Sequence, residues 1–345
     1  MSIAVHIDCR TMTSLRQHRG ELVSRRSPAT YIAMPPDDAE KRLLERARIP
    51  YASCEGSTIV FGQHADELAP LLHIPRLPVL PGGRLPDDDP VGRQLAAAIF
   101  DSLLPEPLIR GEICALTLPL VLPRPIEKTK EWQFFSRVAR LRGFTPIPVD
   151  ACTAAALSGL GHARFTGLAL VIDATASGVA LFHHGAELLR TTVPFGGDWI
   201  DEHLARKTER LVWDMDGACY VDVEAILRWK RERAPNLHAP QNDEVQLLTY
   251  IYEQLVSDLL KAFAKDCERT ASLDTLRQPF SMTCCGAATL LAGFPQLLAN
   301  RIERARLPFD VDELRSPDDG EFAVARGALI QAEIESTPGA IPGAA

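Results

Sequence analysis

The segment from Leu168 to Leu204, LALVIDATASGVALFHHGAELLRTTVPFGGDWIDEHL, constrains the fold more than any other part of the sequence. Leu168 to Ile172 is an apolar run of strand length that ends at Asp173, and small residues separate it from a second apolar run, Val179 to Phe182. A second turn leads to Glu187–Val193, which has the pattern of a third strand. The segment therefore predicts a meander of three strands.

A glycine pair follows the meander and marks the start of a helix. Phe195-Gly196-Gly197-Asp198 breaks the strand pattern, and we expect Asp198 to cap the first turn of the helix. A carboxylate at a strand end, such as Asp173, can hold a hydrated metal ion, while the N–H groups of the adjoining turn face a phosphate. An ordinary buried hairpin explains the same residues equally well, so the segment alone leaves both interpretations open.

The N-terminus repeats this design. Ile3 to Ile7 reads as a strand that ends at Asp8, and the polar turn Cys9–Ser14 precedes a second strand. Two such meanders facing one another could clamp a single anion between them. The internal similarity therefore favours a binding site over an isolated hairpin.

Length, charge and cysteine content narrow the class of protein. A chain of 345 residues is long enough for two domains, and a net charge of −8 argues against a main role in binding nucleic acid. The first residues, MSIAVHID, have neither the pattern of a signal peptide nor that of a transmembrane segment, so we expect a cytoplasmic protein. Eight cysteines without CxxC spacing are expected to be reduced and mostly structural.

Helices and strands alternate along much of the chain. The expected strands between the two meanders are Ile113–Leu118 and Thr145–Val149, and the expected helices are Val91–Leu104, Thr129–Leu141, Asp150–Leu160, Glu244–Arg269, Phe294–Arg304 and Glu321–Glu333. This order predicts an α/β fold. Gly327 lies inside the last of these helices and indicates close packing there.

Several motifs in sequence order resemble those of one superfamily. The motifs are IAVHIDCRTMTS, IVFGQHA, DACTAAALSGL, the Leu168–Leu204 segment, CCGAATLLAGFPQLL and EFAVARGALIQA. Together they are similar to the actin-like ATPases, in particular to the nucleotide-binding domain of DnaK-type heat-shock chaperones and to the bacterial actin MreB. The resemblance extends from end to end of the chain, which makes the shared order more specific than any single motif.

This resemblance implies a two-domain actin-like, ribonuclease H-like fold, with mixed sheets flanked by helices around a central cleft. It places the first domain at 1–150, with an insertion at about 35–90, and the second at 151–335, with a reduced insertion at about 204–245. Residues 336–345 are expected to form a disordered tail. The implied cofactors are ATP or ADP, with Mg²⁺ held through water.

The resemblance also assigns roles to individual residues. Asp8 and Asp173 would orient the water molecules of the metal, and Asp150 stands next to the position of the family's catalytic glutamate. The implied nucleotide-binding residues are Arg10, Thr11, Thr13, Thr175, Ser177, Gly178, Gly196, Gly197, Asp198, Gly286 and Ala287. Gly286 and Ala287 would lie against the adenosine, and the others near the ribose and phosphates.

Departures from the family pattern predict slow or absent hydrolysis. Arg10 replaces a glycine of the first turn, and the second turn reads Thr175-Ala176-Ser177 where the family has glycines and one more residue. Ala151 replaces the glutamate that begins the connecting helix. Cys284-Cys285, which we expect to begin the small-residue turn that continues to Ala288, replaces two glycines. Asp66 lies where the chaperones have a lysine.

Three functions fit these observations. The first is an ATP-binding, chaperone-like or actin-like switch protein that hydrolyses ATP slowly at best and acts on a protein partner. The second is a nucleotide-free pseudoenzyme that serves as a structural or adaptor protein. The third is a polymerising cytoskeletal protein of the bacterial actin type, which would associate with itself.

Overall fold

The computed structural model describes residues 2–18, 20–54, 56–72, 74–213, 219–270, 273, 276, 279–317 and 320–336. The chain divides into two compact units, Met1–Val149 with Gln331–Ala345, and Asp150–Ile330. The last described helix, α10 (Ala323–Ser336), contributes residues to both units. Residues 337–345, which make up most of the tail predicted to be disordered, lie outside the described residues.

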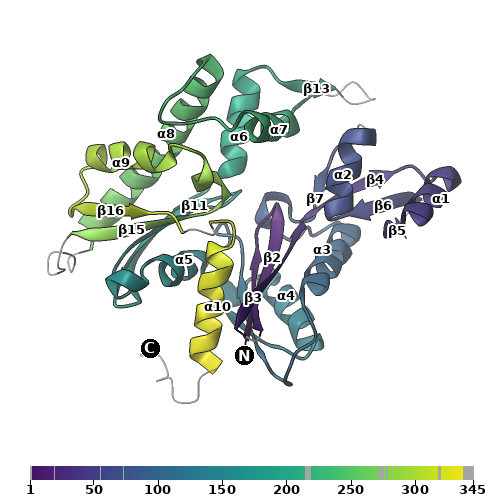
Figure 1. Cartoon of the computed structure of the whole chain (residues 1–345), viewed down its shortest axis with the longest axis horizontal. Coiled ribbons are helices and arrows are strands. Elements are labelled where there is room, and N and C mark those ends of the chain that lie inside the picture. The colour runs from purple at the N-terminus through teal and green to yellow at the C-terminus, as the bar shows by residue number, and fades with distance from the viewer. Residues whose placement is uncertain are drawn as a thin grey trace. The chain divides into compact units, whose positions relative to one another are not determined.

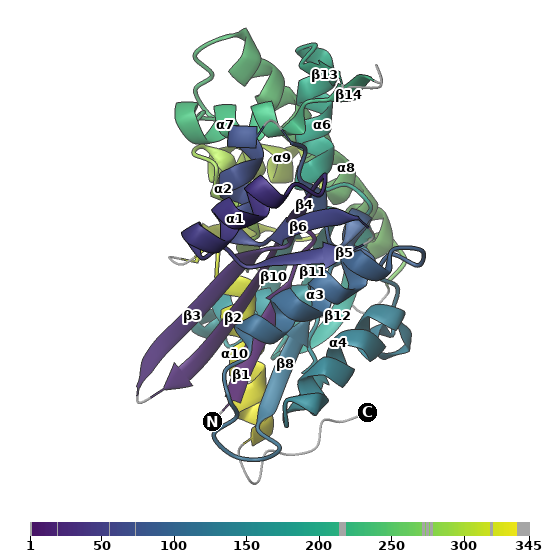
Figure 2. The same ribbon diagram turned by 90° about the vertical axis from the view of Figure 1, so that its right-hand side faces the viewer.

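The first unit is built on a mixed five-stranded sheet with the order β3–β2–β1–β8–β9. Its strands are β1 (Ser2–Ile7), β2 (Thr11–His18), β3 (Glu21–Pro28), β8 (Ile113–Thr117) and β9 (Thr145–Pro148). The first three strands are antiparallel, whereas β1, β8 and β9 run parallel. Helices α3 (Pro90–Leu103) and α4 (Lys130–Leu141) lie on the face of this sheet that is turned to the viewer in Figure 2.

An insertion in the first unit forms a second, smaller sheet with the order β5–β6–β4–β7. Its elements are β4 (Thr30–Met34), α1 (Asp38–Ala47), β5 (Tyr51–Cys54), β6 (Ser57–Phe61), α2 (Gln63–Leu72), β7 (Leu77–Pro78) and the 3₁₀ helix η1 (Pro81–Gly83). Ile32, Val60 and Ala65 belong to a small apolar core shared by this sheet and its two helices. Helix α2 is not among the helices expected from the sequence, and it contains Pro70, a residue type that is unfavourable inside a helix.

The second unit repeats the strand order of the first. Its sheet has the order β12–β11–β10–β15–β16. The strands are β10 (Gly167–Ile172), β11 (Ser177–His183), β12 (Ala186–Val193), β15 (Phe280–Cys285) and β16 (Val311–Arg315). As in the first unit, an antiparallel meander precedes two parallel strands. The predicted meander and the predicted mixed α/β fold are therefore confirmed.

Helices cover both faces of this second sheet. Figure 1 shows α8 (Asp243–Glu268) and α9 (Phe294–Ala305) on one side and α5 (Ala151–Gly159) on the other. Helix α8 buries a row of apolar residues that recur with the helical period, including Leu248, Leu255 and Leu259. Helices α5 and α10 pack closely, since a Cβ at Gly327 of α10 would lie 1.7 Å from the carbonyl oxygen of Ala154 in α5. The small residues of α5 permit this approach. The close packing predicted at Gly327 is thus confirmed.

The remaining elements of the second unit extend from the end of the meander. Helix α6 (Gly197–Lys207) is followed by the two-stranded sheet β13 (Leu211–Trp213) and β14 (Cys219–Val221), and then by α7 (Val223–Arg233). Three short 3₁₀ helices complete the described elements: η2 (Ile126–Lys128), η3 (Gly161–Ala163) and η5 (Ala287–Leu290). All eight cysteines are free thiols, as expected.

His6 lies in the middle of the first sheet and is mostly shielded from water. It belongs to β1 and stands opposite Thr13 of β2 and Thr117 of β8. Its buried Nδ1 has no hydrogen-bond partner among the described residues. Burial disfavours the charged imidazolium and lowers the pKa of His6 from 6.5 to about 4. His6 is therefore neutral in the folded protein at neutral pH.

We predict that His6 makes the folded protein less stable as the pH falls. The unfolded chain binds a proton at His6 near pH 6.5, whereas the folded chain does so only near pH 4, so protonation favours unfolding between these values. Between pH 7.5 and 5, the wild type should lose about 2 kcal/mol more unfolding free energy than His6→Gln, which cannot be protonated. Urea titrations of both proteins at each pH measure this, and equal losses would contradict the prediction.

Candidate functional site

The turn between β1 and β2 carries the first predicted site residues. The backbone N–H of Asp8 donates to the carbonyl oxygen of Thr11 at 2.9 Å, which closes the turn. The Asp8 carboxylate also accepts a hydrogen bond from the N–H of Cys9 at 2.7 Å. Arg10 and Thr11 are partly exposed, whereas Thr13 is buried in β2. Asp8, Arg10 and Thr11 are thus placed at a strand end, where a ligand can be contacted.

The turn between β10 and β11 has the same construction in the second unit. The N–H of Asp173 donates to the carbonyl oxygen of Ala176 at 2.9 Å, and four residues separate the paired Ile172 and Ser177. No residue of either turn is among those with positive φ. Glycine is therefore not required by the backbone of these turns, which explains how Arg10 and Thr175 can stand at family glycine positions.

Helix α6 is fastened directly to this second turn. The N–H groups of Gly197 and Asp198 donate to the carbonyl oxygens of Asp173 and Ala174, each at 2.8 Å. Gly196 begins the helix as its N-cap residue, and no side chain caps it, so the cap predicted at Asp198 is wrong. The first N–H groups of the helix are satisfied by the turn, which makes this a rigid scaffold rather than an open anion site.

Gly196 and Gly286 hold the backbone close on either side of the Asp173 turn. A Cβ at Gly196 would lie 2.3 Å from the carbonyl oxygen of Asp173, and one at Gly286 would lie 2.2 Å from that of Ile172. Gly286 also has a φ of +105°, which favours glycine. A Cβ at Gly197, by contrast, would meet nothing closer than 3.8 Å. The close backbone contacts therefore require glycine at positions 196 and 286 but not at position 197.

The polar side chains around the second turn differ in whether they already have a hydrogen-bond partner in the protein. Ser177 donates from its hydroxyl to the carbonyl oxygen of Phe195 at 2.7 Å, and it is fully buried together with Gly178. The Thr175 hydroxyl is buried and has no hydrogen-bond partner among the described residues. The Asp173 carboxylate is also nearly buried. An unpaired hydroxyl donor beside a carboxylate is suited to a phosphate oxygen and a hydrated cation.

The turn predicted to contact adenosine begins later than expected. Cys284 and Cys285 are the last two residues of β15 and are buried, so their prediction as part of a turn is wrong. Burial raises the pKa of the Cys284 thiol, which makes it unreactive. Gly286 follows the strand, and Ala287 begins η5 with an exposed side chain. Of the four residues Cys284 to Ala287, only Gly286 and Ala287 are accessible to a ligand.

Asp150 has a structural role in the second unit. One carboxylate oxygen accepts the N–H of Cys152 at 2.8 Å and so caps α5. The other forms an ion pair with Arg190 of β12, which also pairs with Glu187 at 2.5 Å. Both oxygens of Asp150 therefore have partners, and the arrangement gives no geometric support to its predicted catalytic role.

A buried polar network near Ala287 was not predicted from the sequence. Lys230 of α7 forms an ion pair with Asp201 of α6, and its Nζ lies 5.6 Å from the centre of the Tyr252 ring. The Tyr252 hydroxyl donates to the carbonyl oxygen of Ala288 at 3.1 Å. The network joins α6, α7, α8 and η5. Its members are far apart in sequence, so no local pattern signalled it.

Aromatic rings line the start of α6. Trp199 lies 5.6 Å from Phe195 and 4.1 Å from His203, measured between ring centres. The spacing of four residues places Trp199 and His203 on one side of the helix, and Phe195 precedes the helix. Phe195 is partly exposed, so this row offers an apolar surface next to Gly196.

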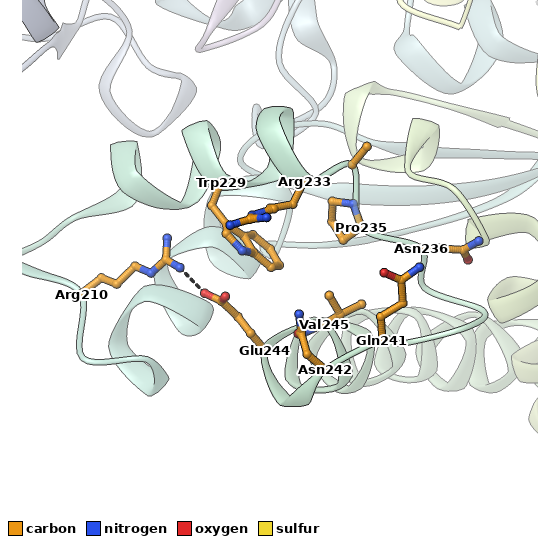
Figure 3. A pocket seen from close by; sticks show the side chains of 10 residues that line it. Arg210, Trp229, Arg233, Pro235, Asn236, Gln241, Asn242, Glu244 and Val245 are labelled. Atoms are coloured by element: carbon orange, nitrogen blue, oxygen red, sulfur yellow. Dashed lines mark hydrogen bonds and ion pairs between the residues drawn. The ribbon is translucent and has the colours of Figure 1, made fainter.

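A polar pocket of about 490 Å³ opens between α7 and the start of α8 (Figure 3). Trp229, Asn236 and Gln241 line it, and Arg210 and Glu244 form an ion pair at its edge. Arg233 also faces it and has no ion pair within the described ranges. None of the residues predicted to bind nucleotide lines this pocket.

Within the part of the chain that the structure describes, no group of three or more His, Cys, Asp or Glu side chains is arranged to hold a metal ion. Asp8 and Asp173, the predicted metal-orienting residues, lie in different units. No described helix combines the length and apolar character needed to cross a membrane.

Comparisons with known proteins identify the fold. A family model described as Volactin matches residues 1–332, and a comparison with curated proteins gives no match. A MamK double helical filament is similar over 96% of this chain and 99% of that chain, with 15% identity and a TM-score of 0.70. MreB 5 of Spiroplasma citri bound to AMPPNP is similar over 96% and 97%, with 14% identity and a TM-score of 0.63. The predicted actin-like fold is confirmed.

We predict that Gly196→Ala destabilises the second unit far more than Gly197→Ala does. The added Cβ at Gly196 overlaps two carbonyl groups of the turn, which should lower the unfolding free energy by about 3 kcal/mol. Gly197→Ala is the matched control, because its Cβ has space and should change stability by less than about 1 kcal/mol. Denaturant titration distinguishes the two, and equal effects would contradict the fixed approach of α6 to the turn.

A second prediction concerns Asp150. Asn at this position can still cap α5 but leaves Arg190 without its main partner, so Asp150→Asn should lower the unfolding free energy by about 2 kcal/mol. Asp222→Asn is the control, because Asp222 caps α7 by accepting the N–H of Ala225 and has no ion pair among the described residues. This change should alter stability by about 0.5 kcal/mol or less. Loss of nucleotide hydrolysis in Asp150→Asn at unchanged stability would contradict the structural role.

Proposed function

The chain belongs to the Volactin family, and from this membership we propose that it is an actin-like protein that binds ATP or ADP and assembles into filaments. One observation carries the proposal: the whole chain resembles the subunit of a MamK double helical filament, with nearly complete coverage of both chains. This similarity favours the cytoskeletal interpretation over the chaperone-like switch that the sequence placed first. Self-association is therefore the proposed partner interaction.

Nucleotide binding is the second part of the proposal. Solved structures with the same fold include MreB proteins bound to AMPPNP and to ADP. In this chain, we assign the phosphate contact of the second unit to the turn at Asp173, where the unpaired Thr175 hydroxyl can donate to a phosphate oxygen. Gly286 and Ala287 would lie against the base. Ser177 and Asp150 are left out, because their side chains have partners in the protein.

In the first unit we assign the corresponding contact to Asp8, Arg10 and Thr11. The guanidinium of Arg10 can pair with a phosphate through several N–H donors. Asp8 and Asp173 would orient the water molecules of Mg²⁺, which neutralises phosphate charge when it is bound. Hydrolysis is proposed to be slow, because Asp150, the carboxylate next to the family's catalytic position in the sequence, is held in a cap and an ion pair.

Sedimentation tests the proposed function. The pelleted fraction of the protein should rise with MgATP above a critical concentration and remain low without nucleotide. Asp173→Asn should raise that critical concentration about tenfold, since it removes a charge that would face the hydrated metal. Glu202→Gln, an exposed change on α6, should leave it unaltered. A pelleted fraction that stays low with MgATP, MgADP and no nucleotide alike would overturn the proposal.

A further inference from the structure

Strand β3 is an open edge of the first unit's main sheet. It is hydrogen-bonded to β2 on one side only, and Figure 2 shows it at the outer margin of the sheet. The six residues from Glu21 to Arg26 are all exposed, although the Arg25 side chain also contacts α3 by donating to the carbonyl oxygen of Ser102. Leu22 and Val23 each expose 47% of their surface. The strand therefore presents apolar side chains and unpaired backbone groups together.

Such an edge is unusual for a strand of eight residues. Proteins usually protect edge strands by keeping them short, by placing charged residues, especially lysine, or proline within them, or by covering them. In β3 the only proline, Pro28, is the last residue, and the charged residues Glu21, Arg25 and Arg26 have opposite signs, so they repel a second copy only in some registers. This edge can therefore accept another strand through backbone hydrogen bonds.

The charges of β3 are complementary to a second copy of the same strand. In an antiparallel pair with Val23 opposite Val23, Glu21 of each copy faces Arg25 of the other. The spacing of two residues places Glu21, Val23 and Arg25 on one face of the strand. Directly opposite side chains of opposite charge stabilise an antiparallel pair, and here the same pair forms twice.

A shift of register removes this complementarity. If the copies slide by one pair, Val23 faces Arg25, and Glu21 faces the neutral Ser27. Arg25 is already oriented, because one of its nitrogen atoms donates to the carbonyl oxygen of Ser102 at 3.3 Å. A guanidinium carries five N–H donors, so others remain for a carboxylate. Charge and orientation therefore select the register centred on Val23.

We propose that β3 is a two-fold interface through which two copies of this chain join their sheets edge to edge. The centre of the interface is Val23, and the Glu21–Arg25 pairs flank it on both sides. A two-fold contact uses the same patch on both copies and closes on itself, so it cannot by itself extend a filament. The β3 interface therefore goes beyond the proposed function. It would join two subunits or, where filaments exist, two antiparallel filaments.

Charge exchange tests the interface. In sedimentation velocity without nucleotide, Glu21→Arg and Arg25→Glu should each weaken dimer formation at least about tenfold, because each places like charges opposite one another. The double variant Glu21→Arg/Arg25→Glu should restore the dimer to within about threefold of the wild type. Glu202→Arg and Arg206→Glu, an exposed pair on α6, are controls with the same changes in net charge and should have no effect.

Two outcomes would overturn the proposal: a double variant that dimerises no better than the single variants, or single variants that match the wild type. A cross-link provides the second measurement. With Cys54 and Cys219 changed to serine, Val23→Cys should form a disulfide-linked dimer under mild oxidation, whereas Gln17→Cys on β2 should not. Both tests measure dimer formation without nucleotide, so they can be interpreted even if the protein forms no filaments. Conversely, loss of the dimer would not change the fraction of protein that pellets with MgATP.

Discussion

The attachment of helix α6 to the Asp173 turn is the interaction on which the candidate site depends. Two backbone N–H groups at the start of the helix bind two carbonyl oxygens of the turn, and Gly196 permits the approach because it has no Cβ. The bonds leave the carboxylate of Asp173 and the hydroxyl of Thr175 at a fixed strand end. The helix therefore acts as a support for the turn, and the contact with phosphate is assigned to side chains of the turn.

The duplicated architecture explains how degenerate motifs can coexist with an intact fold. Both units place an Asp at the end of the first strand of a meander and close the next turn with the same backbone hydrogen bond, Asp8 to Thr11 and Asp173 to Ala176. The backbone of neither turn needs positive φ, so substitutions there change the chemistry of the site without disturbing the strands. The glycines that must remain are Gly196, which lies against the Asp173 turn, and Gly286, which lies against Ile172 of β10.

Local sequence patterns predicted the strands and long helices, because their apolar periods follow directly from which face is buried. The meander and α8 are examples, and the order of motifs predicted the actin-like fold. Interactions between distant residues could not be predicted in this way: the Asp150–Arg190 ion pair and the Lys230–Asp201–Tyr252 network connect separate elements. The prediction that Asp198 caps α6 was wrong. An acidic residue after two glycines suggests a side-chain cap, whereas here the carbonyl oxygens of the Asp173 turn accept the first N–H groups of the helix.

We propose that the Asp173 turn binds a nucleotide phosphate in an assembling actin-like protein. A cryo-electron microscopy reconstruction of the protein with AMPPNP and Mg²⁺ tests it most directly. We expect repeating subunits with density for phosphates beside Thr175 and for the base beside Gly286. A polymer whose subunits lack nucleotide density at this turn, or density located only in the Arg210–Glu244 pocket, would contradict it.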